Sequence, residues 1–233
     1  MRFAALRKIW FTRAIKEQGL KMGLFLAVSA FRNVNPREVA QACADYLLSY
    51  GVECAARPPD ADVDHHTDAM IFQSQEGWLV VLWPEYFGVN VGAAARGMAA
   101  EHGWLISTIK VYDGAYWDHL AYLGQEELHS HCSWLNYWDE ESQASDWEPD
   151  PAKLAAALGV SADVLRPYLI DAGMIQDEAE PRKANADDNF ELRNIWVFVD
   201  FWRRLGVTYP EPGKNIAQIL RITTDGFMDK LPV

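Results

Sequence analysis

The sequence predicts an α+β protein: a ferredoxin-like antiparallel sheet covered by two helices, followed by a mostly helical C-terminal region. Three observations lead to this prediction. The first half alternates short apolar runs with amphipathic stretches, in the order strand, helix, two or three strands, helix, strand. The second half has apolar residues at helical spacing behind helix-start signals. The composition, 50% hydrophobic and 23% charged, is that of an ordinary globular protein.

Three regions are expected. Residues 1–21 form a basic N-terminal extension with six Lys or Arg and one acid, 22–134 form the α+β sheet domain, and 135–233 form an acidic, mostly helical region. Because no flexible Gly/Ser linker precedes the last region, we expect it to pack on the sheet.

The apolar run at 23–30 has three interpretations. The first is a buried strand, and the second is the apolar core of a signal peptide. The third is that Met22 is the natural start, so that residues 1–21 are a translated upstream extension. We favour the strand, because the run is short and leads directly into a strand–helix unit.

Turn residues separate the predicted elements of the sheet domain. Asn35 and Pro36 are suited to cap and start a helix that ends at Gly51. Gly103 ends a second, alanine-rich helix at 90–102. The remaining apolar runs predict strands at 23–31, 52–57, 69–72, 78–83, 104–111, 116–123 and 127–132.

The acidic region begins its helices in the same way. Asp150 and Ser161 are N-cap residues for helices at 151–158 and 161–170. The strongest amphipathic pattern predicts a long helix at 190–205. The final apolar run, 216–222, is compatible with a strand or a helix.

The charge of the chain limits its partners. The formal net charge is −12, which disfavours nucleic acid and anionic membranes, because phosphate binding needs Lys and Arg. The three cysteines contain no CxxC pair and indicate a reducing compartment. No apolar run reaches the roughly 18 residues of a membrane helix. We therefore expect a cytoplasmic protein without a membrane partner.

Acidic charge is concentrated in residues 139–191, which hold fourteen Asp or Glu and four Lys or Arg. Large aromatic residues lie in or beside this stretch, among them Trp134 and Tyr137. Charge accelerates association with an opposite partner, and aromatic residues anchor it. The alternative is a solvated face that serves solubility. The predicted partner-binding residues, named here the acidic belt, are Trp138, Asp139, Glu140, Glu141, Asp146, Trp147, Glu148 and Asp150.

Three histidines form the most site-like cluster. Alternation along a strand puts His129 and His131 on one face, and His119 on the neighbouring strand faces the same way. Three imidazoles on one face have the ligand number for zinc. The simpler interpretation is partly exposed strand histidines without a ligand role, because no HExxH motif is present.

Other chemical signatures are absent from the sequence. There is no GxSxG, GxGxxG or P-loop, and each cysteine is best explained as a core or bystander thiol. We therefore predict no catalytic residue and no cofactor, and the enzyme interpretation is the less favoured one.

A resemblance rests on three segments: Tyr112-Asp-Gly-Ala-Tyr-Trp-Asp-His-Leu-Ala-Tyr-Leu-Gly-Gln-Glu-Glu-Leu-His, Pro151-Ala-Lys-Leu-Ala-Ala-Ala-Leu-Gly and Asp200-Phe-Trp-Arg-Arg-Leu-Gly. Together they resemble small uncharacterised bacterial proteins of the toxin-immunity type. The resemblance implies a cytosolic, acidic, non-catalytic inhibitor of a cationic toxin. It assigns no role to an individual residue.

The predicted function is a non-catalytic protein-binding module that inhibits a basic partner by occlusion, as an immunity or antitoxin-like protein does. One alternative is an enzyme of unrecognised class that uses the His119, His129 and His131 face, with or without a metal. Another is a structural subunit of a homo-oligomer with its aromatic residues at the self-interface.

Overall fold

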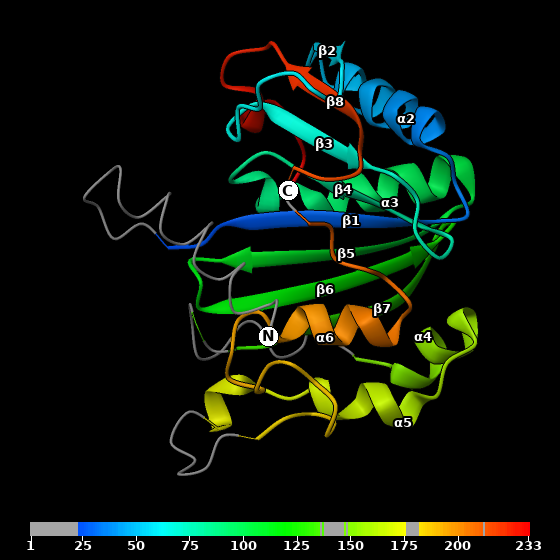
Figure 1. Cartoon of the computed structure of the whole chain (residues 1–233), viewed down its shortest axis with the longest axis vertical. Helices are drawn as coiled ribbons and strands as arrows, with labels where there is room; N and C mark the ends of the chain where they lie inside the picture. Colours follow the sequence, from blue (N-terminus) through cyan, green and yellow to red (C-terminus); the bar gives the residue numbers. More distant parts are fainter. Residues whose placement is uncertain (1–22, 136, 138–146, 148, 176–181, 212) are drawn as a thin grey trace.

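The computed structural model describes residues 23–135, 137, 147, 149–175, 182–211 and 213–233, and their strands form one eight-stranded sheet. The strand order is β2-β8-β3-β4-β1-β5-β6-β7, and every neighbouring pair is antiparallel. In Figure 1, α6 lies in front of this sheet and α3 behind it. The sheet is therefore covered on both faces.

Seven strands lie between residues 26 and 132, and the eighth lies near the C-terminal end of the chain. They are β1 Leu26–Arg32, β2 Cys54–Arg57, β3 Asp68–Phe72, β4 Trp78–Leu82, β5 Leu105–Tyr112, β6 Tyr116–Leu123, β7 Glu126–Cys132 and β8 Ile216–Ile222.

Five α-helices and several short 3-10 turns complete the described part. The helices are α2 Pro36–Ser49, α3 Val91–His102, α4 Pro151–Leu158, α5 Ala162–Leu165 and α6 Val197–Arg204; the 3-10 turns are η1 Phe87–Val89, η3 Arg166–Tyr168, η4 Ala172–Ile175 and η5 Phe227–Lys230.

The prediction of a ferredoxin-like sheet with two helices and a mostly helical C-terminal region is wrong. The sheet has eight strands, and five helices are distributed over its two faces. The run at 216–222 is a strand, β8, which lies between β2 and β3. The Arg221 guanidinium donates to both carboxylate oxygens of Asp68 in β3, at 2.7 and 2.6 Å. In this way β8, from near the C-terminal end, separates β2 and β3, which follow each other in the sequence.

Alternation along the strands divides the core into two layers. Ala27 and Phe31 of β1 pack with α2 and α3, whereas Val28 and Ala30 belong to the opposite layer. The opposite layer contains the apolar side of α6 and side chains from α4 and α5. Trp202 of α6 is fully buried there. The helical segments after residue 150 thus cover the face that α2 and α3 leave open.

Two predicted helices are shorter than their apolar patterns. The helix expected at 161–170 leaves the α conformation after Leu165, because Pro167 has no N–H for the helical ladder. The helix expected at 190–205 starts only at Val197. Upstream, the Asp200 carboxylate accepts the backbone N–H groups of Asn189 and Phe190, which holds that segment against α6.

The helix-start signals near residues 35 and 150 are confirmed. The Asn35 side chain accepts the N–H groups of Arg37 and Glu38, and the Glu38 carboxylate accepts the N–H of Asn35.

Within the described residues, no helix combines the length and the apolar character that crossing a membrane requires.

Candidate functional site

Most of the acidic belt lies outside the described residues: Trp138, Asp139, Glu140, Glu141, Asp146 and Glu148. Asp150 and Trp147 are described. Asp150 is the N-cap of α4, and its carboxylate accepts the N–H groups of Ala152 and Lys153 at 3.0 Å each. This acid therefore has a structural role, whatever the belt binds.

Aromatic residues beside the belt are in contact with one another. The Tyr137 ring lies 5.1 Å from that of Tyr116 and 5.5 Å from that of Trp134. The centroid of the Phe25 ring lies 4.9 Å from that of Tyr112 and 4.7 Å from that of Tyr86, so Phe25 connects the two tyrosines. We name this set the aromatic row: Tyr86, Phe25, Tyr112, Tyr116, Tyr137 and Trp134.

The aromatic row is partly accessible to solvent. Tyr86 is 40% exposed, Phe25, Tyr112 and Tyr137 are half-buried, and Tyr116 is buried. The row joins the start of β1, the β5–β6 turn and the segment before the belt, which are far apart in the sequence. Sequence reasoning found Trp134 and Tyr137 but missed the others, because no pattern links residues 25, 86 and 112.

The three histidines meet on one face, as the strand alternation predicted. His119 of β6 pairs with His131 of β7, and Ala121 pairs with His129. Their interpretation as partly exposed side chains is wrong, because His119, His129 and His131 are 0, 1 and 4% exposed. Phe201 of α6 covers His119 and His129, with ring centroids at 4.9 and 6.3 Å. The cluster is part of the interior between the sheet and α6.

A chain of hydrogen bonds crosses this interior. The Trp202 indole N–H donates to Ser107 Oγ at 3.0 Å, and Ser107 Oγ lies 2.8 Å from His119 Nε2. His119 Nδ1 lies 2.8 Å from His129 Nδ1. The buried Nε2 atoms of His129 and His131 have no hydrogen-bond partner among the described residues. The chain therefore ends at the unsatisfied Nε2 atom of His129, and the Nε2 atom of His131 is a second unsatisfied ring nitrogen beside it.

Burial keeps these imidazoles neutral. It lowers the pKa of His129 to about 4 and that of His131 to about 3, and it lowers the pKa of His119 well below its usual range. Across the described ranges, no three His, Cys, Asp or Glu side chains are arranged to hold a metal ion. The arrangement is that of a polar core, because all three side chains are buried.

The thiols are not activated nucleophiles. Burial raises the pKa of Cys43, Cys54 and Cys132 above the usual range, and the nearby Asp118 carboxylate raises that of Cys132 further. Protonated thiols are poor nucleophiles and poor metal ligands.

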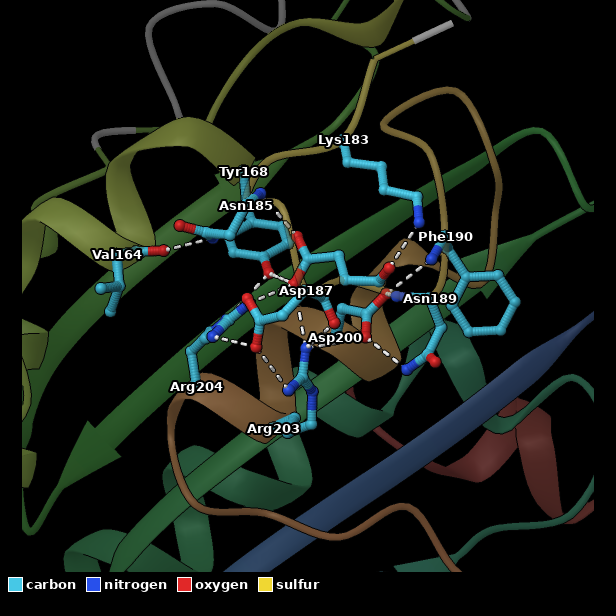
Figure 2. Close-up of polar contacts among 11 residues, drawn as sticks. Val164, Tyr168, Lys183, Asn185, Asp187, Asn189, Phe190, Asp200, Arg203 and Arg204 are labelled. Atoms are coloured by element: carbon cyan, nitrogen blue, oxygen red, sulfur yellow. Dashed lines mark hydrogen bonds and ion pairs between the residues drawn. The ribbon is translucent and has the colours of Figure 1, made fainter. Parts of the chain in front are cut away.

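An ionic network, drawn in Figure 2, joins the segment before α6 to that helix. The buried Asp188 carboxylate accepts hydrogen bonds from Tyr168, Arg203 and Arg204. Arg203 and Arg204 also bind Asp187, which is largely exposed. Because both buried carboxylates, Asp188 and Asp200, are surrounded by donors, we assign the network a structural role. The spacing of charged residues in the sequence did not predict this ionic network.

A small cavity lies on the opposite face of the sheet, beside the start of α3. Its volume is about 170 Å³, and Trp147 of the acidic belt forms part of its wall. Lys110 and Asp118 line its floor and form an ion pair at 2.5 Å. Burial raises the pKa of Asp118, and the Lys110 ammonium opposes that shift. This ion pair was not predicted, because its partners meet only across the β5–β6 pair.

Comparison with known proteins provides no relative from which a function can be transferred. The resemblance to toxin-immunity proteins therefore stays a prediction. No protein-family model matches the chain, and no match is found among curated proteins or solved structures.

Proposed function

We propose that this chain is a non-catalytic, cytoplasmic binding protein that captures a basic protein partner and blocks it by occlusion, as an immunity or antitoxin-like inhibitor does. The observation that supports the proposal is the aromatic row, which adjoins in sequence the acid-rich part of the belt. Anchoring aromatic residues bordered by charge are typical of protein-binding surfaces.

The aromatic row supplies the contact area. A row of rings held by edge-to-face and stacked contacts is rigid, so few rotamers are lost when a partner packs on it. Within the aromatic row, Tyr86 has the largest exposed fraction, so it is the first candidate for a direct contact with the partner.

The belt supplies the charge. Six acids and no Lys or Arg lie between residues 139 and 150 in a chain of net charge −12. Such a concentration attracts a cationic partner and raises its association rate, and salt weakens the attraction. A toxin with a basic active cleft has the matching chemistry.

We do not propose an enzyme that uses the histidine face. His119, His129 and His131 are buried under α6, and a general base or metal ligand must reach its substrate.

Affinity capture from the source organism, followed by binding measurements on the purified pair, tests the proposal. One variant neutralises Asp139, Glu140, Glu141, Asp146 and Glu148 together and leaves Asp150 intact, because Asp150 caps α4. A second variant is Tyr86→Ala. Its matched control is Tyr50→Ala at the C-cap of α2, since Tyr50 is 41% exposed and lies outside the row.

A single basic protein that binds the intact chain and Tyr50→Ala is expected. Both test variants should weaken its affinity by about tenfold or more, and the association rate should fall between about 50 and 200 mM salt. Failure to capture any protein, or a captured protein that binds all four chains equally, would overturn the proposal.

A further inference from the structure

The two edges of the sheet differ in how they are covered. The edge strand β7 is buried from Leu128 to Cys132, and α4 packs against it. At the other edge, at the top of Figure 1, β2 pairs only with β8 among the described strands. Glu53, Ala55 and Ala56 at this edge are exposed. An accessible strand edge is a template for pairing with another strand.

Backbone contacts fix which groups of β2 are directed toward β8. The Glu53 carbonyl accepts the N–H of Thr223 at 2.9 Å, and the Glu53 N–H donates to the Thr224 hydroxyl at 2.8 Å. Both backbone groups of Glu53 therefore face the β8 side of the strand.

The residues after Glu53 alternate in direction. The register with β8 runs through Ala55 and Arg57 without a shift. Because hydrogen-bonded and non-hydrogen-bonded residues alternate in an antiparallel pair, Ala55 and Arg57 also direct their backbone groups toward β8. The N–H and C=O groups of Cys54 and Ala56 consequently point away from the sheet, along its open edge.

The side chains of β2 are divided between the two faces of the sheet. Cys54 packs on the core layer that contains α2, so Glu53, Ala55 and Arg57 lie on the opposite face. Burial raises the pKa of the Cys54 thiol, and the nearby Asp45 carboxylate of α2 raises it further, which places Asp45 on the Cys54 side of the strand. The two charged side chains of the edge, Glu53 and Arg57, are thus separate from the charge on α2.

A second copy of this chain fits the open edge in one register. If Cys54 lies opposite Ala56 of the second copy in an antiparallel pair, each outward N–H of one copy meets an outward C=O of the other. Cys54 opposite Cys54 would bring Ala56 to Val52, whose N–H already donates to the Leu47 carbonyl. Ala56 opposite Ala56 would bring Cys54 to Pro58, which has no N–H.

The same register brings opposite charges together. Glu53 lies opposite Arg57 of the second copy at each end of the paired strands, and Ala55 lies opposite its own counterpart. Among the described residues, neither Glu53 nor Arg57 has an ion-pair partner. The neighbouring cation in β8, Arg221, is already paired with Asp68. Opposite charges directly across an antiparallel pair stabilise it.

We propose that this chain forms a symmetric homodimer in which the β2 strands of two copies pair in antiparallel and join their sheets into one. The same residues contribute from both copies, so the interface closes with two. The backbone groups of Cys54 and Ala56 supply the hydrogen bonds, and the contacts between Glu53 and Arg57 fix the register. The interface shares no residue with the aromatic row or the acidic belt, so it goes beyond the proposed binding of a basic partner.

Sedimentation equilibrium of the full chain, over a wide range of protein concentration, measures this self-association. The variants Arg57→Glu and Glu53→Arg each place like charges opposite each other across the interface. The double variant Glu53→Arg/Arg57→Glu restores opposite charges. The matched control is Arg37→Glu, which changes the net charge as much as Arg57→Glu does, at an exposed position in the first turn of α2.

A dimer that dissociates on dilution is expected for the intact chain and for Arg37→Glu. Each single reversal should raise the dissociation constant by about tenfold or more, and the double variant should return it to within about threefold of the intact value. A role of either residue in folding alone would not give this recovery. An intact chain that stays monomeric at every concentration, or a double variant as weak as the single ones, would overturn the proposal.

A cysteine at the centre of the paired strands reports the register directly. Residue 55 faces its own counterpart with Cα atoms about 4.5 Å apart, within the roughly 4.4–6.8 Å range of disulfides. Ala55→Cys should therefore give a covalent dimer under mild oxidation, and Ala100→Cys, at an exposed position of α3, should not. Equal yields from the two variants would refute the register. A dimer that Tyr86→Ala weakens as much as Arg57→Glu does would place the self-interface at the aromatic row and overturn the proposal.

Discussion

His119 Nδ1 and His129 Nδ1 lie 2.8 Å apart in the interior of the protein, so one ring must donate a proton to the other. Trp202 donates to Ser107 Oγ, and we assign the Ser107 hydroxyl as the donor to His119 Nε2. His119 then carries its proton on Nδ1 and donates to His129, whose own proton is on Nε2. Every contact in the chain then has one donor and one acceptor.

Acid should destabilise the protein through these histidines. The pKa values are depressed in the folded state, so between about pH 6.5 and about pH 4 the unfolded chain binds protons that the folded chain does not. The free energy of unfolding should fall by about 1.4 kcal/mol per pH unit for each buried histidine as the pH drops through this window. Above about pH 6.5 their contribution is constant.

Urea unfolding at pH 7.5, 6.5 and 5.5, followed by tryptophan fluorescence, measures this dependence. The variant His129→Gln should reduce the slope below pH 6.5, and the variant His65→Gln, at an exposed loop position, should keep it. A free energy of unfolding that is the same at pH 7.5 and 5.5 in the intact chain would refute the prediction.

Removing the hydroxyl of Ser107 should destabilise the core. The Ser107→Ala variant leaves the Trp202 indole N–H and His119 Nε2 without a partner in a buried site, at a cost of about 1–3 kcal/mol. Ser49→Ala is the control, because Ser49 donates to the Tyr46 carbonyl at the exposed end of α2 and should change stability by less than about 0.5 kcal/mol. Equal unfolding free energies for the two variants would contradict the role of Ser107.

Two acids of the ionic network should differ sharply in their effect. Asp200→Asn removes the charge that accepts the Asn189 and Phe190 amides in the interior, and the loss should be on the order of 3 kcal/mol. Asp187→Asn, the same change at an exposed carboxylate of the network, should cause a smaller loss. Urea unfolding of the two variants decides the comparison, and a larger loss for Asp187→Asn would show that the buried contacts are not the stabilising ones.

The insertion of β8 into the sheet should make its buried residues essential for stability. Ile219 is fully buried and pairs with Met70 of β3 and Arg57 of β2, so Ile219→Ala should cost about 2–5 kcal/mol. Gln218→Ala, one residue earlier and half-buried, should change stability by less than about 0.5 kcal/mol. Thermal or urea unfolding gives both values, and similar small losses would place β8 outside the cooperative core.

Local rules were enough to predict many elements. Asn35 and Pro36 start α2, Asp150 caps α4, and the alternation in β6 and β7 brings the three histidines to one face. These features depend on residues within a few positions of each other or on a hairpin register, where backbone geometry leaves little choice.

Tertiary contacts decided the rest. The apolar run of β8 has the same pattern as a buried helix, and only the gap between β2 and β3 made it a strand. The helix α6 is shorter than its pattern because Asp200 captures amides from the segment before it.

The sequence by itself determined the helix caps, the hairpins and the acidic character of this protein. Only the tertiary structure decided that the histidines are buried under Phe201, that Phe25, Tyr86 and Tyr112 join the aromatic row, and that Arg96 and Lys110 meet at one cavity. The physical reason is that burial and the meeting of distant side chains depend on how layers pack, and periodicity reports only one element at a time.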